Sequence, residues 1–171
     1  IGFIFGIATA MLMYLPIEFQ PGIIGDARGA PILMSGIIGG PLAMVLTTAI
    51  AAATRYYIGG SGALVGVAYI LIFGLIGLAW NRFCLHYDRN PHKVLENACL
   101  ATFATVASAP LVLLFPAEIQ FRVLIGIWPE LWVANVVGLA ILTSLIDKER
   151  QRRQTEEQLV IARETADQAS A

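Results

Sequence analysis

Charged residues are scarce in this sequence of 171 residues: they make up 13% of it, while 57% is hydrophobic. A soluble domain usually carries about 25% charged residues, so this much charge cannot cover a globular surface in water. None of the charges falls within 29–54, 56–81, 97–117 or 131–146. A transmembrane helix needs about 20 mostly apolar residues. These segments are therefore predicted to lie in a membrane, rather than in a soluble core that would need polar partner helices.

Cysteine is also scarce, with two residues, Cys84 and Cys99. Their number and spacing predict neither a disulfide framework nor a zinc site. His86 and His92 lie near Cys84 and Asp88, but this spacing matches no standard set of metal ligands. The sequence also has no nucleophile–base arrangement and no phosphate-binding glycine loop with lysine. We therefore predict no catalytic residue, no metal and no cofactor, and the net charge of −1 gives no reason to expect a nucleic-acid partner.

The two ends of the chain suggest a piece of a longer protein. The first residue is Ile1, inside an apolar run, and the run lacks the basic start and small-residue cleavage site of a signal peptide. The other end stops within a helical pattern. We therefore expect further residues before Ile1 and an output domain after Ala171.

Helix breakers and polar segments divide the chain into an all-α, polytopic transmembrane bundle. Pro16 is predicted to stop the first segment, and Pro110 to kink a later one. The predicted spans are 1–16, 29–56, 61–81, 97–115 and 130–146, which make six membrane segments if 29–56 is a hairpin. The predicted loops between them are 17–28, 82–96 and 116–129.

The segment 29–56 has two interpretations. Gly39-Gly40-Pro41 lies near its centre, and proline removes a backbone donor and clashes with the preceding turn. We favour two short helices, 29–38 and 41–56, joined by a tight turn, over one broken span. The choice matters because a single span would place Arg28 and Arg55 about 40 Å apart at 1.5 Å per residue, whereas a hairpin would place both at one end.

The basic residues predict the orientation of the bundle. Eight of the eleven lie in 82–96 or after residue 146, and basic loops stay on the cytoplasmic side. Two predicted spans separate these regions, and an even number of spans places both regions on the same side of the membrane. We expect a bacterial inner membrane protein with a cytoplasmic C-terminus and with Arg55 at the outer face.

The segment 147–171 differs from the rest because it is polar and helical in pattern. Leu159, Ala162, Ala166 and Ala169 repeat at spacings of three and four, which is typical of a coiled-coil seam. The alternative is a single solvated helix. We favour a cytoplasmic signalling helix that makes the protein a homodimer, and we divide the chain into a transmembrane domain, 1–146, and this helix, 147–171.

Three arginines, Arg28, Arg55 and Arg122, lie outside the two basic regions. Ionisable groups at the edge of a membrane span are expensive and often functional, and arginine can bind a carboxylate through two hydrogen bonds. We predict that Arg28 and Arg55 bind a small anion in the hairpin geometry. Arg122 is better explained as a long side chain that reaches the membrane surface.

Two further features lie close to these arginines. Asp26 either pairs with Arg28 or Arg55, or caps the following helix. Gly59 and Gly60 either present backbone N–H groups to the anion, as helix N-termini do, or form a plain turn. Both are included in the predicted ligand-binding set.

The ordered polar landmarks resemble a known family, the LytS-type five-transmembrane sensor domain (5TM-5TMR_LYT). The resemblance covers about 1–146 and rests on Gly25-Asp26-Ala27-Arg28, on 36–41, and on Arg55 followed by Gly59-Gly60. It implies an outward-facing cavity for a small molecule, with Arg28 and Arg55 as ligand-binding residues. Some members bind pyruvate, and in such a member a polar or thiol group is expected where this chain has Gly66.

The resemblance implies the sensor module of a bacterial two-component sensor histidine kinase. The segment 163–171 is similar to the helix that leads into the phosphoacceptor helices of such kinases, which favours a kinase over a diguanylate cyclase. We expect the module to bind a small anion, of the carboxylate class, and to pass the signal through its last helix. The alternatives are a transporter-like substrate-binding protein and an anchor that only localises an enzyme.

Overall fold

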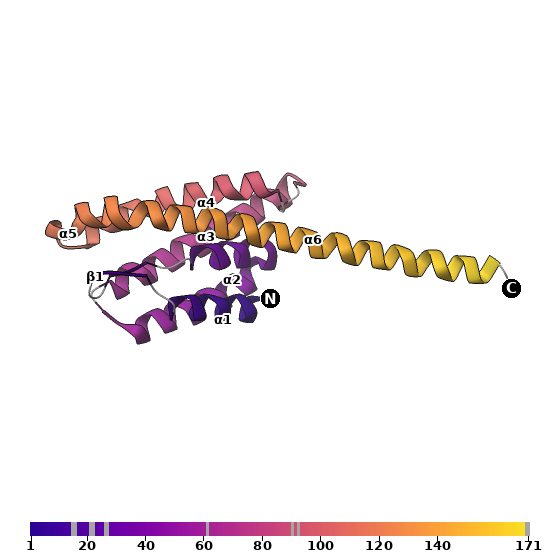
Figure 1. Ribbon diagram of the computed structural model, residues 1–171, viewed down its shortest axis with the longest axis horizontal. Helices are drawn as coiled ribbons and strands as arrows, with labels where there is room; N and C mark the ends of the chain where they lie inside the picture. Colours follow the sequence, from indigo (N-terminus) through magenta and orange to yellow (C-terminus); the bar gives the residue numbers. More distant parts are fainter. Residues whose placement is uncertain are drawn as a thin grey trace.

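The computed structural model describes residues 1–14, 17–20, 23–25, 28–60, 62–89, 91 and 93–169, and for 17–20, 23–25 and 163–169 the backbone only. The described chain is almost entirely helical, as predicted (Figure 1). Its elements are α1 (Gly2–Met13), β1 (Ile17–Gln20), β2 (Ile23–Gly25), α2 (Gly29–Ile58), α3 (Ala63–His86), α4 (Val94–Ser108), the 3-10 helix η1 (Ala109–Leu114), α5 (Ala117–Arg122), the π-helix η2 (Val123–Ile127) and α6 (Trp128–Ala169).

Four helical segments are long and apolar enough to cross a membrane. They are Gly29–Ile58, Ala63–His86, Val94–Leu114 and Ala117–Ala162, and the shorter α1 is apolar as well. Large apolar side chains also point outward from the bundle, among them Leu42, Leu64, Leu75 and Phe103. An outward apolar surface of this kind needs lipid around it, so the chain is a multi-pass membrane protein.

Helix α2 is interrupted at Gly40. This residue has φ 66° and ψ −160°, a backbone region that is essentially restricted to glycine, and Pro41 follows it. The residues before and after it, 29–39 and 41–58, are therefore two helices that meet at a sharp turn. Figure 1 shows the chain reversing here, so that both ends of α2 lie at the same end of the bundle. The hairpin is the correct interpretation of this segment.

The core lies between α2, α3, α4 and α6. Ile32, Leu33 and Ile37 of α2 and Ile70 and Phe73 of α3 are fully buried there. Close contact between α2 and α3 depends on small residues, since a side chain at Gly77 would collide with the backbone carbonyl of Leu33. Small residues at helix contacts are typical of membrane bundles, where close packing rather than the hydrophobic effect holds helices together.

Buried polar residues join α6 to α4. Asn97 Nδ2 donates to Thr143 Oγ1 at 3.1 Å and to the Pro91 carbonyl at 2.9 Å. Trp128 Nε1 donates to the Thr105 carbonyl at 3.3 Å, and Trp132 Nε1 donates to a side-chain oxygen of α4 at 3.1 Å. These bonds follow the length of α4, so they fix α6 along the bundle.

Three predicted loops are wrong in part. Segment 17–28 contains an antiparallel pair of short strands, β1 and β2. The polar segment 82–96 begins later than predicted, because α3 continues to His86 before the chain turns. Segment 116–129 is helical throughout its described length from residue 117, as α5, η2 and the start of α6. Apolar residues in 119–128 pack against η1, and this packing favours a helix over a loop.

Two prolines explain the irregular helices. Pro110 lies in η1, directly after α4, so the interruption predicted there is a change from α-helix to 3-10 helix. Pro129 is the second residue of α6 and follows η2. A proline removes one hydrogen bond and pushes away the carbonyl four residues earlier, which is here Ile125. The wider π-helical turn at that point accommodates the ring.

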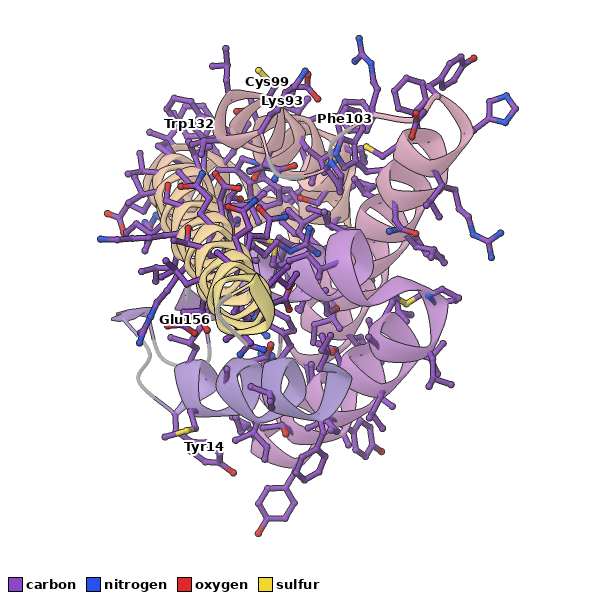
Figure 2. All side chains as sticks on the ribbon, turned by 90° about the vertical axis from the view of Figure 1, so that its right-hand side faces the viewer. Tyr14, Lys93, Cys99, Phe103, Trp132 and Glu156 are labelled. Atoms are coloured by element: carbon purple, nitrogen blue, oxygen red, sulfur yellow. The ribbon has the colours of Figure 1, made fainter. Side chains whose placement is uncertain are left out.

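Helix α6 continues without a break through residues 146 and 147, where the predicted transmembrane domain ends and the predicted signalling helix begins. Its 42 residues correspond to about 63 Å at 1.5 Å per residue. Figure 1 shows its second half projecting away from the bundle, and Figure 2 looks along this projecting end towards the bundle behind it. Two ion pairs, Arg152–Glu156 and Arg153–Glu149, both at 2.9 Å, lie on this exposed part.

Candidate functional site

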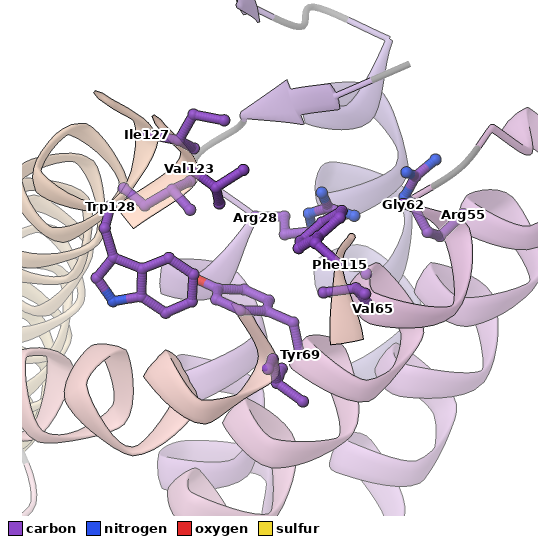
Figure 3. A pocket seen from close by; sticks show the side chains of 12 residues that line it. Arg28, Arg55, Gly62, Val65, Tyr69, Phe115, Val123, Ile127 and Trp128 are labelled. Carbon is purple, nitrogen blue, oxygen red and sulfur yellow. The ribbon is translucent and has the colours of Figure 1, made fainter. Parts of the chain in front are cut away.

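A cavity lies at the end of the bundle where α2, α3 and α6 begin (Figure 3). Its volume is about 60 Å³. The described residues that line it come from α2, α3, η1, η2, α6 and their flanking positions. They are Arg28, Arg55, Gly62, Val65, Gly66, Tyr69, Leu111, Phe115, Val123, Ile127, Trp128 and Leu131.

Arg28 and Arg55 both line this cavity, although 27 positions separate them in the sequence. Arg28 immediately precedes the first half of α2, and Arg55 lies in the last turn of the second half. The reversal at Gly40 therefore brings them to the same end. Their exposed fractions are only 6% and 3%. Guanidinium groups are rarely buried to this degree without a structural or functional reason.

The Arg55 side chain is held on two sides. Its Nη1 donates to the Gly59 carbonyl at 2.7 Å. On the opposite side it lies across Gly66 of α3, where a Cβ atom would be 2.6 Å from Arg55 Nε. This departure from the polar or thiol group expected at position 66 in a pyruvate-binding member therefore has a physical role: the missing side chain makes room for the guanidinium group.

Gly59 and Gly60 form the turn between α2 and α3. Both have positive φ angles, 73° and 89°. The Gly59 N–H donates to the Arg55 carbonyl at 3.2 Å, and the Gly60 carbonyl accepts from Ala63 N–H at 3.1 Å. Gly62, rather than either of these glycines, is among the described lining residues. The pair therefore positions Arg55 and the start of α3.

The other candidates are less informative. Asp26 lies outside the described residues, as does His92. Arg122 is at the same end of the bundle, in α5, but is exposed and does not line the cavity. Within the part of the chain that the structure describes, no group of three or more His, Cys, Asp or Glu residues is placed to hold a metal ion.

The sequence interpretation missed three aromatic residues of the cavity, Tyr69, Phe115 and Trp128. Tyr69 is 7% exposed, and its ring centroid lies 6.0 Å from the Arg28 guanidinium carbon. A signal for it exists, because Gly62, Gly66 and Tyr69 follow one another at spacings of four and three, which places them on one face of a helix. Trp128 could not be found in this way, since it was assigned to a loop.

The cavity combines two guanidinium groups with mostly apolar walls. The cavity volume of about 60 Å³ is small, so the cavity suits a small ligand. In an apolar setting, a charged hydrogen bond to arginine is stronger than in water. The start of α3 adds a partial positive charge. The arrangement favours a small anion with a planar pair of oxygens.

Fold and cavity together define a class: a multi-pass membrane protein with a small, buried, arginine-containing site at one end of its bundle. The comparison with known families agrees with this description. The family model 5TM-5TMR_LYT, described as "5TMR of 5TMR-LYT", matches residues 1–149. The chain therefore belongs to the 5TM-5TMR_LYT family of membrane sensor domains, which are typical of LytS-like histidine kinases. No curated protein and no solved structure matches the chain.

Proposed function

We propose that this chain is the sensor module of a bacterial two-component histidine kinase and that it binds a small carboxylate in the cavity between Arg28 and Arg55. The observation that carries the proposal is the burial of both guanidinium groups in one cavity. A carboxylate offers two oxygens in a plane, which is the geometry that a guanidinium group binds best.

The proposal places the cavity at the outer face of the bacterial inner membrane. The cavity is at the start of α3 and α6, whereas the basic turn after α3 and the tail of α6 lie at the opposite end (Figure 1). Basic segments stay in the cytoplasm, so the cavity opens towards the outside. A reporter enzyme that works only in the cytoplasm is therefore expected to be active when it is fused after residue 169.

Helix α6 is the element that would carry the signal. Trp128 and Leu131, at its start, line the cavity, and the same helix continues to Ala169. Occupancy of the cavity can then change how α6 packs, and a continuous helix passes a shift or rotation to its other end. The ligand must bind the two signalling states with different affinity, since otherwise its binding does not shift the equilibrium between them.

The projecting end of α6 is proposed to pair with that of a second copy. Leu159, Val160 and Ile161 are 65%, 56% and 61% exposed there, beyond the bundle and outside the predicted membrane segments. Three large apolar side chains on one isolated helix are unfavourable in water. A parallel pair of helices would cover part of them, which supports the predicted homodimer.

The test is a binding screen on the purified chain in detergent, with formate, acetate, propionate, lactate and pyruvate as probes. Binding is measured as a thermal shift and then by isothermal titration. Arg28→Ala and Arg55→Ala are each expected to weaken binding by at least about tenfold, because one charged hydrogen bond is worth about 1.5–3 kcal/mol. Arg122→Ala is the matched control, since it removes the same charge at the same end of the bundle from an exposed position.

A loss in both cavity variants, with normal binding by Arg122→Ala, would support the site. The proposal would be refuted if the unchanged chain and the three alanine variants bound equally well. It would also be refuted if none of the five carboxylates bound to the unchanged chain. Arg55→Lys separates charge from geometry: it keeps the charge but lacks the planar fork, so it should also bind weakly.

A further inference from the structure

A groove runs between α3 and α4 at the end of the bundle opposite the arginine cavity. Its volume is about 660 Å³. The second half of α3 forms one wall, and the N-terminal part of α4 forms the other. Apart from Glu96, the described residues that line it are aliphatic, aromatic or cysteine. Figure 2 shows Lys93, Cys99 and Phe103 along this side of the bundle. The groove is therefore an apolar recess in the surface that faces lipid.

Three stacked aromatic rings mark the depth of the groove in the membrane. The ring centroids of Trp80 and Phe83 are 5.4 Å apart, and those of Phe83 and Tyr87 are 4.7 Å apart. Trp80 and Phe83 line the groove, and Tyr87 is the exposed residue that ends α3. Tryptophan and tyrosine are enriched at the level of the lipid headgroups. This end of the groove is therefore expected at headgroup level, with the rest in the hydrocarbon.

Two basic side chains lie at the same end of the groove. Lys93 Nζ is 3.0 Å from Glu96 Oε1, and Arg89 Nη1 is 4.0 Å from the same oxygen. The Arg89 guanidinium carbon also lies 6.0 Å from the centre of the Phe83 ring. Both Glu96 and Phe83 line the groove. The two cations are thus placed at its edge, and because their side chains are 56% and 50% exposed, they are accessible to a further anion.

The balance of charge at this edge favours an anion. One carboxylate oxygen serves two cations, so positive charge exceeds negative charge there. The segment 82–96 as a whole has three Lys or Arg and two Asp or Glu, an excess of one positive charge. A headgroup with an ammonium group would add to this excess, whereas a headgroup with a net negative charge neutralises it. Basic pockets between membrane helices bind anionic headgroups for this reason.

We propose that the α3–α4 groove binds one anionic phospholipid, whose phosphate is held by Lys93 and Arg89 and whose acyl chain lies in the apolar part. In the proposed orientation, this lipid belongs to the cytoplasmic leaflet. Asn97, which directly follows Glu96, bonds to Thr143 of α6, so the lipid adjoins the contact between α4 and α6. The site is separate from the arginine cavity, and the inference does not depend on carboxylate binding.

The test is native mass spectrometry of the whole chain in detergent, titrated with phosphatidylglycerol, phosphatidylethanolamine or phosphatidylcholine that carry the same acyl chains. Phosphatidylglycerol should bind at least about fivefold more tightly than either zwitterionic lipid. Lys93→Gln and Arg89→Gln should each weaken phosphatidylglycerol binding by about fivefold, the value for one basic residue near a membrane surface. Both side chains are half exposed, so both variants should fold, which their unfolding midpoints in lipid-free detergent will check.

Arg82→Gln is the control for charge. Arg82 is an exposed residue of α3 at the same end of the bundle, but it is not among the described residues that line the groove. Its substitution should change phosphatidylglycerol affinity by less than about twofold, within the scatter of independent sites.

Ala79→Phe tests the apolar part of the groove without altering any charge. Ala79 is an exposed lining residue, so a ring at this position enters the groove rather than the core. It should weaken phosphatidylglycerol binding by about fivefold or more, the usual minimum for overpacking. Leu75→Phe is the matched control. Leu75 lies on the same helix and is 58% exposed, but it is not among the described lining residues, and its substitution should leave the affinity unchanged.

Four results would overturn the proposal. The first is equal affinity for phosphatidylglycerol and the zwitterionic lipids. The second is an equal loss in Arg82→Gln and Lys93→Gln, which would indicate a general attraction to the basic end. The third is unchanged phosphatidylglycerol affinity in Ala79→Phe. The fourth is a dimer in lipid-free detergent that Ala79→Phe converts to a monomer, since a second copy would then occupy the groove. None of these results bears on carboxylate binding, so the two proposals fail independently.

Discussion

Gly66→Ala is the substitution that tests the site most directly, because it acts on Arg55 without altering any charge. The added Cβ atom would lie 2.6 Å from Arg55 Nε, 3.0 Å from Cγ and 3.1 Å from Cδ. Comfortable contacts between such atoms are about 3.5–4.0 Å. The Arg55 side chain must therefore move by roughly 1 Å at its closest point, away from the position that its bond to the Gly59 carbonyl supports.

The expected energies predict that Gly66→Ala weakens carboxylate binding more than it destabilises the fold. Overpacking of this kind costs about 1–3 kcal/mol, but alanine is favoured over glycine inside a helix by about 1 kcal/mol. The net loss of folding free energy should be no more than about 2 kcal/mol. The displaced guanidinium group, in contrast, loses a charged hydrogen bond to the ligand worth about 1.5–3 kcal/mol, which weakens binding by about 10- to 150-fold.

The measurement is isothermal titration with the best-binding carboxylate, combined with a thermal unfolding midpoint for each protein. Gly126→Ala is the control, because it makes the same chemical change near the cavity at a position where a Cβ atom has nothing within 4 Å. Carboxylate affinity equal in Gly66→Ala and in the unchanged chain would show that the ligand does not contact Arg55, and the reasoning from the cavity would be refuted.

Three further substitutions test the fold. Gly40→Ala should cost about 1–3 kcal/mol, because its φ of 66° and ψ of −160° are strained for any side chain. It should also weaken carboxylate binding, which requires the α2 reversal; normal affinity would contradict this. Thr47→Val removes a donor to the Gly2 carbonyl at 2.9 Å and should lower the free energy of unfolding of the bundle by roughly 1 kcal/mol, with unchanged carboxylate affinity. Arg152→Ala breaks the exposed pair with Glu156, and a loss of stability above about 1 kcal/mol would be inconsistent with a surface ion pair.

Much of the fold could be predicted because membrane insertion imposes a simple rule on the sequence. The apolar segments without charge became helices, and Pro110 marks the predicted interruption. The break at Gly39-Gly40-Pro41 was also readable, since glycine and proline restrict the backbone locally. The prediction of a loop at 116–129 was wrong for a non-local reason: its helical state depends on packing against η1, and the sequence of the segment alone does not reveal that contact.

The candidate site was predictable only in part. Arg28 and Arg55 were visible as charges in an apolar sequence, and their chemistry suggested an anion. Tyr69 and Asn135 were not visible as a hydrogen-bonded pair, because 66 positions separate them and each is an ordinary residue of its own helix. An asparagine inside a membrane helix commonly bonds to a neighbouring helix, but the sequence held no information on the partner of Asn135.

The sequence by itself determined that the chain spans a membrane as apolar helices, because a chain with so few charges has no other stable environment. It also determined where the helix in 29–58 can reverse, since Gly40 tolerates a backbone conformation that other residues avoid. Only the tertiary structure decided which side chains share the cavity. Arg28, Arg55, Tyr69 and Trp128 come from three helices, and the distances between them depend on how those helices pack, which is a property of the whole bundle.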